Sequence, residues 1–214
     1  MNRLLPSFGR RHGRKLRSSR SVLLETALPS LLIAPGYVAA APLWFEIGFG
    51  SGEHLAEQAR RNPQVNFIGC EPYVNGMTTL LAAIQKNDLR NIRLYDGDAR
   101  MLLEAMPDES IDRMFILFPD PWPKARHHKR RIISQESLTL FYKKLKAGGM
   151  LRVATDHVDY CEWMLEQFLI FAQFTWEAKT QSDWQNPPPD WVPTRYQAKA
   201  LAEGRQATFL EWRK

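Results

Sequence analysis

The segment 118–131, FPDPWPKARHHKRR, holds the residues whose types and spacing say most about chemistry. Asp120 lies between two prolines, and Trp122 follows it. Five Lys or Arg residues come within the next stretch, 124–131. A rigid turn that presents a carboxylate and a ring beside dense positive charge is suited to holding a base while phosphates are bound. The segment therefore predicts a nucleic-acid active site with Asp120 as its candidate catalytic residue.

A second group of candidate residues surrounds the glycine-rich turn EIGFGSG, residues 46–52. The turn follows an apolar run at 43–47, and open α/β sheets bind ligands at the carboxyl ends of such strands. Glu71 and Asp98 end the next two strand-like runs, where they could hold ribose hydroxyls and an adenine amino group. Alternate glycines let the backbone approach a nucleoside closely. The predicted cofactor-binding residues are therefore Glu46, Gly48, Gly50, Gly52, Glu71 and Asp98.

The choice of cofactor rests on Glu53. A dinucleotide-binding turn has a third glycine at that position, next to the pyrophosphate. A carboxylate there would repel phosphate, whereas S-adenosylmethionine carries a sulfonium and an ammonium that Glu46 and nearby acids would attract. The pattern favours S-adenosylmethionine over a nicotinamide dinucleotide.

The positive charge is concentrated in two places. The net charge is +6, with six Lys or Arg in residues 10–20 and five in residues 124–131. Without these eleven, 18 cations remain against 23 acids. Two basic patches on an otherwise acidic chain indicate a polyanionic partner.

Length and composition predict one domain, residues 21–214, preceded by a basic and mobile N-terminal arm, residues 1–20. Cys70 and Cys161 lie far apart and show no metal-ligand spacing, so no disulfide framework or metal site is expected. The start of the chain resembles a signal peptide, but Pro29, Pro35 and Pro42 interrupt its apolar stretch,. We therefore expect a cytoplasmic protein with no membrane association.

The rest of the chain alternates strand-like and helical runs, which predicts an α/β fold with a doubly wound parallel sheet. The expected helix from Glu136 to Lys146 ends at Gly148-Gly149 before a fifth strand. Two late strand-like runs predict an antiparallel C-terminal hairpin, for seven strands in all, and the polar Pro-rich stretch between them predicts a loop. The expected strands cover 43–47, 65–71, 91–98, 111–118, 150–155, 174–179 and 206–213.

Nearly the whole chain resembles the bacterial tRNA (guanine-N7-)-methyltransferases of the TrmB family. The resemblance is carried by RRHGRKLR, EIGFGSGEHL, GCEPYVNG, FPDPWPKARHHKRRI, ATDH and TRYQAKALAEGRQATFLEWR. It implies a Rossmann-like class I S-adenosylmethionine-dependent methyltransferase fold, with a seven-stranded, mostly parallel sheet. It also implies methyl transfer to N7 of guanosine in the variable loop of tRNA, position 46 in tRNA numbering.

The resemblance implies roles for individual residues. Asp120 would be both the catalytic acid and a cofactor ligand. Pro123 departs from relatives that carry His there, so no side-chain chemistry is expected at that position. The implied substrate-binding residues are Lys124, Arg126, His127, His128, Lys129, Arg130, Arg131, Asp156, Thr194, Arg195, Tyr196 and Gln197.

Guanine N7 has a free lone pair and no hydrogen, so its methylation needs alignment and not a general base. Asp120 is therefore expected to accept hydrogen bonds and to balance cationic charge. Trp122 could either stack on a base or belong to the core. Methylation of an exocyclic amine and tRNA binding without catalysis remain alternatives, and the protein could be a monomer or a homodimer.

Overall fold

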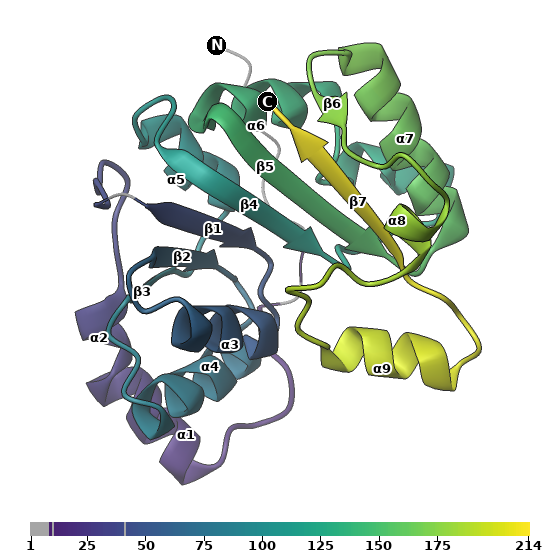
Figure 1. The fold of residues 1–214 in the computed structure, drawn as a ribbon. Coiled ribbons are helices and arrows are strands. Elements are labelled where there is room, and N and C mark those ends of the chain that lie inside the picture. The colour runs from purple at the N-terminus through teal and green to yellow at the C-terminus, as the bar shows by residue number, and fades with distance from the viewer. Residues whose placement is uncertain (1–8, 10, 41) are drawn as a thin grey trace.

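A computed structural model describes residue 9 and residues 11–40 and 42–214. The described chain forms a seven-stranded sheet with helices on both faces (Figure 1). The strand order is β3-β2-β1-β4-β5-β7-β6. The strands are β1 (Leu43–Ile47), β2 (Asn66–Cys70), β3 (Ile92–Tyr95), β4 (Ile111–Leu117), β5 (Leu145–Thr155), β6 (Thr175–Trp176) and β7 (Thr208–Arg213).

The pairing of the strands confirms the predicted mostly parallel sheet. Strands β1 to β5 pair in parallel, whereas β7 is antiparallel to both β5 and β6. The chain builds β2 and β3 on one side of β1 and then places β4 on the other side. The order of the strands thus reverses between β1 and β4, and a crevice forms at their carboxyl ends.

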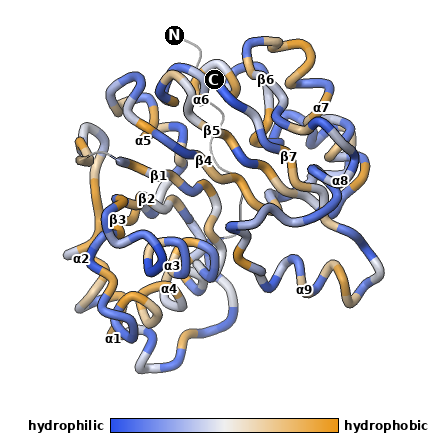
Figure 2. Tube along the Cα trace, in the orientation of Figure 1, coloured by the Kyte–Doolittle hydropathy of each residue, from blue (hydrophilic) through white to orange (hydrophobic). Residues whose placement is uncertain are grey.

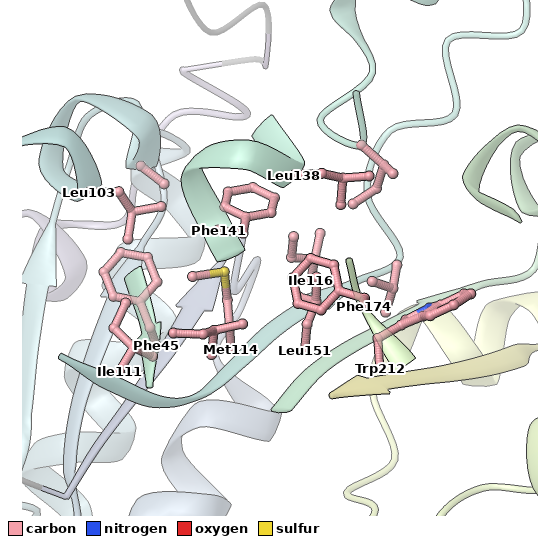
Figure 3. Packing of buried hydrophobic residues seen from close by; sticks show 14 of the residues in the cluster. Phe45, Leu103, Ile111, Met114, Ile116, Leu138, Phe141, Leu151, Phe174 and Trp212 are labelled. Atoms are coloured by element: carbon pink, nitrogen blue, oxygen red, sulfur yellow. The ribbon is translucent and has the colours of Figure 1, made fainter. Parts of the chain in front are cut away.

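Helices cover both faces of the sheet, and a separate buried hydrophobic cluster lies on each face. Along β4, Met114 and Ile116 belong to one buried cluster, and Phe115 and Leu117 to the other, because successive side chains of a strand point to opposite faces,. Figure 3 shows the first cluster. Hydrophobic residues run along the central strands in Figure 2. One face packs α1 (Ser18–Thr26), α2 (Leu28–Leu31), α3 (Glu53–Arg61) and α4 (Val74–Lys86), and the other α5 (Ala99–Ala105), α6 (Gln135–Lys144) and α7 (Val158–Phe171).

The end of α6 differs from the prediction. The helix ends at Lys144, and β5 begins at the next residue. Gly148, expected to lie just past the helix, instead adopts a φ of 74° where the register of β5 against β4 shifts. Backbone hydrogen bonds with Lys214 hold Gly148 and Gly149 in the sheet. The two glycines therefore form a bulge in β5. Glycine is common both in bulges and just after helices, so the sequence alone does not distinguish the two.

The C-terminal elements are shorter than predicted. The run 174–179 forms only the two-residue edge strand β6, and the Pro-rich stretch contains one short helix, α8 (Ser182–Gln185). Helix α9 (Arg195–Ala202) follows and lies below the carboxyl ends of the strands in Figure 1.

Part of the basic N-terminal segment lies against α4. The amide of Val74 donates to the carbonyl of Arg11 at 2.9 Å. Asn75 accepts from the Gly13 amide and donates to the Arg14 carbonyl, each at 2.8 Å. Residues 1–8 and 10 of the predicted arm lie outside the described residues, and its mobility stays a prediction.

The described residues contain neither a membrane-spanning helix nor a cluster of metal-binding side chains. No helix within 9, 11–40 and 42–214 has the length and apolar character needed to cross a membrane. Within the same residues, no three or more His, Cys, Asp or Glu side chains are grouped so that they could hold a metal ion. Cys70 and Cys161 are free thiols.

Candidate active site

A cavity of about 730 Å³ opens at the carboxyl ends of the parallel strands. The structure brings the glycine turn after β1 and the proline turn after β4 together in its wall, although about 70 residues separate them in sequence. Glu71, Asp98 and Tyr196 complete the wall from other elements. The lining includes Gly48, Gly50, Glu71, Asp98, Asp120, Trp122, Lys129, Arg130 and Tyr196.

The glycine turn has a conformation that requires glycine. Gly48, Gly50 and Gly52 have φ values of 72°, 56° and 77°, in the left-handed region that other residues rarely adopt,. A Cβ on Gly50 would come within 2.9 Å of the Tyr196 ring. Gly52 does not line the cavity; it precedes α3, and a Cβ there would approach Leu80 within 2.7 Å. The first two glycines thus shape the cavity, and the third allows α3 to pack on α4.

Glu71 connects the end of β2 to this turn. Its two carboxylate oxygens accept from the amides of Gly50 at 2.7 Å and Tyr73 at 2.9 Å. Burial raises the pKa of Glu71, these two hydrogen bonds oppose the rise, and the negative charges of Asp120 and Glu46 add to it. The cavity therefore gathers negative charge, which a cationic ligand would relieve.

Glu46 is not in the cavity wall described here. It is 3% exposed, and its Oε2 lies 2.7 Å from Nδ1 of the equally buried His54 on α3. The His54 ring packs on Phe115 and Trp191. Trp44 and Glu46 are two residues apart in β1, so their side chains point to the same face of the sheet. Trp44 packs on the face that α3 covers, and the Glu46 carboxylate therefore lies on that face as well. Its predicted contact with the cofactor stays a prediction.

Asp98 lies at the N-terminus of α5. It accepts from the Arg100 amide at 3.0 Å, and its oxygens lie 3.0 and 2.6 Å from Nε and Nη2 of the Arg100 guanidinium. Both residues line the cavity. Sequence reasoning missed Arg100, although a basic residue two positions after the acid at a helix start is a usable signal.

The proline turn carries unusual backbone angles. Phe118 and Trp122 have φ values of 52° and 44°, which cost about 1–3 kcal/mol each for residues other than glycine,. Asp120 lies between them at the cavity surface. The walls restrict its hydration, and this desolvation raises the pKa of Asp120. The turn thus presents a carboxylate acceptor to the cavity.

Trp122 lies in the cavity wall and not in the core. The guanidinium of Arg130 is 4.9 Å from the centroid of its ring, and His127 meets the ring edge-on at 5.8 Å. Burial, followed by the positive charge of Arg130 and its neighbours, lowers the pKa of His127. His127 is therefore biased towards its neutral form.

The basic run forms the short helix η1 (Ala125–Arg130) beside this turn. Lys124, Arg126 and Lys129 are exposed, whereas the His128 ring packs edge-on against Trp163 at 5.3 Å. Arg131, the last predicted substrate-binding residue of the run, is buried, 3% exposed. Its predicted contact with RNA stays a prediction.

The predicted substrate residues near the C-terminus have separate positions. Thr194 starts α9 by accepting from the Gln197 amide, and Gln197 itself accepts from Trp191 Nε1 at 2.7 Å. Arg195 pairs with Glu53 at 2.6 Å. Of these four consecutive residues, only Tyr196 is in the cavity wall.

Asp156 follows β5 and is held by Arg205, whose Nε donates to its Oδ2 at 2.8 Å. The sequence gives no signal for this pairing, because the two residues are 49 positions apart. His157 begins α7, and its Nδ1 accepts from the Tyr160 amide.

The same fold occurs in solved structures of distant sequence. A 16S rRNA methyltransferase, KamB, matches with a TM-score of 0.60 at 16% identity, covering 80% of this chain and 86% of that one. An rRNA methylase from Streptococcus thermophilus matches with a TM-score of 0.54 at 13% identity, covering 92% and 93%. The sheet order and these matches define a Rossmann-like methyltransferase fold.

Sequence comparison gives the family. The family model described as "Putative methyltransferase" matches residues 40–210. A tRNA (guanine-N(7)-)-methyltransferase of Roseobacter denitrificans is 42% identical over 218 residues, 95% of this chain and 93% of the relative. That of Zymomonas mobilis is 43% identical over 215 residues, with 97% and 93% covered. The chain belongs to the bacterial tRNA (guanine-N7-)-methyltransferase family, TrmB, which confirms the resemblance found in its sequence.

Proposed function

We propose that this protein transfers the methyl group of S-adenosylmethionine to N7 of a guanosine in the variable loop of tRNA, position 46 in tRNA numbering. The observation that carries the proposal is the shared cavity. A glycine turn and a carboxylate-bearing proline turn open onto it together. Membership of the TrmB family supports the same reaction. We expect the protein to act on tRNA in the cytoplasm.

The residues of the cavity fit this cofactor. Gly48 and Gly50 have no side chains, so the backbone is open to a nucleoside,. Glu71 and Asp98 offer carboxylate acceptors at the ends of β2 and β3. When bound, S-adenosylmethionine supplies an electrophilic methyl group on a positively charged sulfur, and the carboxylates of the cavity wall would stabilise that charge,. Glu46 is proposed to support the site from behind the turn.

The residues of the proline turn would orient the base. Guanine N7 offers its lone pair directly, so Asp120 would accept hydrogen bonds from guanine N–H groups or from the cofactor ammonium. Alignment of this kind can lower a barrier by up to about 7–11 kcal/mol. The exposed cations Lys124, Arg126 and Lys129 beside the cavity would bind phosphates,. The docked segment 11–20 would extend this surface.

The experiment is incubation of the purified protein with labelled S-adenosylmethionine and an unmodified tRNA transcript, followed by nucleoside analysis. The expected product is N7-methylguanosine, which is located by cleavage with mild reduction and aniline. A transcript with adenosine at the variable-loop position is the matched control and should gain no label. A product methylated on an exocyclic amine, or tRNA binding without label transfer, would contradict the proposal.

A further inference from the structure

Arg131 is unlike the other cations of the basic run. Its guanidinium is 1% exposed, whereas Lys124, Arg126 and Lys129 lie at the surface. A charged side chain is buried at a large cost in free energy unless it is paired and hydrogen-bonded. The contacts that offset this cost therefore indicate what Arg131 does.

One contact is with the proline turn itself. Nε of Arg131 donates to the carbonyl of Pro121 at 2.8 Å. Pro121 lies between Asp120 and Trp122, and the φ of 44° at Trp122 is unfavourable for a residue with a side chain,. The carbonyl is part of the peptide unit between Pro121 and Trp122, so this hydrogen bond resists rotation of that unit. It therefore restrains the backbone directly after Asp120.

The remaining contacts anchor the guanidinium to α7. Its Nη2 donates to Asp159 in the first turn of that helix, and this bond is the main cause of the lowered pKa of Asp159. The guanidinium also lies over the rings of Tyr160, at 4.9 Å, and Trp163, at 5.1 Å. Tyr160 is fully buried. Arg131 thus ties the turn after β4 to the rigid start of the helix after β5.

We propose that Arg131 is a positioning residue, which holds the Asp120 turn in its active shape through the Pro121 carbonyl and the Asp159 carboxylate, and does not contact RNA. The proposal rests on the proposed function of the same site. A guanidinium that is 1% exposed and already paired has no free face for a phosphate. A planar fork can serve both partners at once, and the ammonium of a lysine cannot reproduce this geometry.

The test separates positioning from RNA binding. R131K is compared with R126Q, which alters an exposed cation, and with R90K, a matched control at an exposed arginine that pairs with Asp88. We measure the single-turnover rate per active site at saturating tRNA and cofactor, and the tRNA Kd at several salt concentrations. R131K should lower the rate by about 10- to 100-fold. Its tRNA Kd should stay within about twofold of wild type, with an unchanged salt slope.

R126Q should show the opposite pattern, with weaker tRNA binding and a salt slope smaller by about one. R90K should behave as wild type. If R131K instead weakens tRNA binding and reduces the slope as R126Q does, or keeps the wild-type rate, the proposal is wrong. A purely structural role would lower the thermal midpoint and the fraction of active sites without changing the rate per site.

A milder variant covers the case in which R131K does not fold. The Asp159 side chain is 56% exposed, so D159N should fold and should lower the rate by about 3- to 10-fold,. The double variant should be no slower than R131K, because both changes act on one network. A wild-type rate in D159N would count against the proposal. Wild-type nucleoside analysis tests the proposed function separately, and the salt slopes decide the role of Arg131 even if the product is a different nucleoside.

Discussion

The Glu71 carboxylate accepts a 2.7 Å hydrogen bond from the amide of Gly50, so the end of β2 holds the turn that follows β1. The other oxygen accepts from Tyr73 at the start of α4. With both oxygens engaged, the carboxylate has one orientation at the cavity wall. Its raised pKa shows that burial outweighs these bonds. The residue therefore supports the turn and offers charge to a ligand at the same time.

The first prediction concerns cofactor affinity. Glu71→Gln replaces one acceptor oxygen with an NH₂ group that faces an amide donor, and the turn loses a hydrogen bond. The S-adenosylmethionine Kd should rise at least about tenfold, in line with about 1.5–3 kcal/mol for a hydrogen bond to a charged group. Isothermal titration calorimetry measures it, with Glu104→Gln on the exposed side of α5 as the matched control. An unchanged Kd in Glu71→Gln would remove Glu71 from the site.

The second prediction separates activity from stability at Asp120. Asp120→Asn should lower the single-turnover rate by about 100-fold, because the amide presents a donor where an acceptor is needed to align the base. Binding of tRNA should change little, since no cation of the basic run is altered. A rate near that of wild type would contradict the catalytic role.

The same variant should be more stable than wild type at neutral pH. The native pKa of Asp120 lies above its usual value of 3.8, so the folded state binds this proton more tightly than the unfolded chain does. The ionised carboxylate thus opposes folding above its native pKa, and this penalty shrinks as the pH falls and is lost only below 3.8, where the unfolded chain is protonated as well,. Thermal unfolding should show Asp120→Asn above wild type at pH 7, with no difference left below pH 3.8. A lower midpoint at pH 7 would contradict this sign.

The third prediction tests the shape of the glycine turn. Gly50→Ala places a Cβ within 2.9 Å of the Tyr196 ring at a φ of 56°. Gly36→Ala is the matched control, because its φ is 93° and a Cβ there meets nothing within 4 Å. Both variants should lose about 1–3 kcal/mol of stability from backbone strain. Only Gly50→Ala should also lose most of its cofactor affinity. Equal cofactor affinities in the two variants would show that cofactor binding does not depend on the close approach of Gly50 and Tyr196.

Much of this architecture follows from local pattern. The apolar runs before Gly48 and Glu71 end where β1 and β2 end, because buried parallel strands are apolar throughout and loops are polar,. The strand expected to reach Asp98 is shorter, since β3 ends at Tyr95. The meeting of the glycine turn with Asp120 follows in turn from the right-handed crossovers of a doubly wound sheet. Sequence reasoning therefore placed the glycine turn and Asp120 at one cavity, although it missed Arg100 in the wall.

Local sequence pattern could not predict where the side chains of Arg131 and Glu46 lie. Arg131 ends a run of surface cations, and its tertiary contacts, which include Asp159 28 residues later, draw it inside. Glu46 belongs to the glycine motif, but the alternation along β1 directs its side chain towards His54 on α3,. For Arg131 a contact with a distant segment overrides the local pattern, whereas for Glu46 the alternation of the strand outweighs the position of the residue in a glycine motif,.

The fourth prediction concerns this buried pair. Glu46→Ala leaves Nδ1 of His54 without its partner at a site where both residues are almost fully buried, and should cost about 1–3 kcal/mol of unfolding free energy,. The loss of cofactor affinity should be smaller than in Glu71→Gln, because Glu46 is absent from the cavity wall. Denaturant unfolding and calorimetry measure the two effects. His54→Ala and the double variant complete a cycle whose coupling energy should account for most of the lost stability. If Glu46→Ala instead abolishes cofactor binding while stability is unchanged, the carboxylate contacts the ligand directly and its pairing with His54 is secondary.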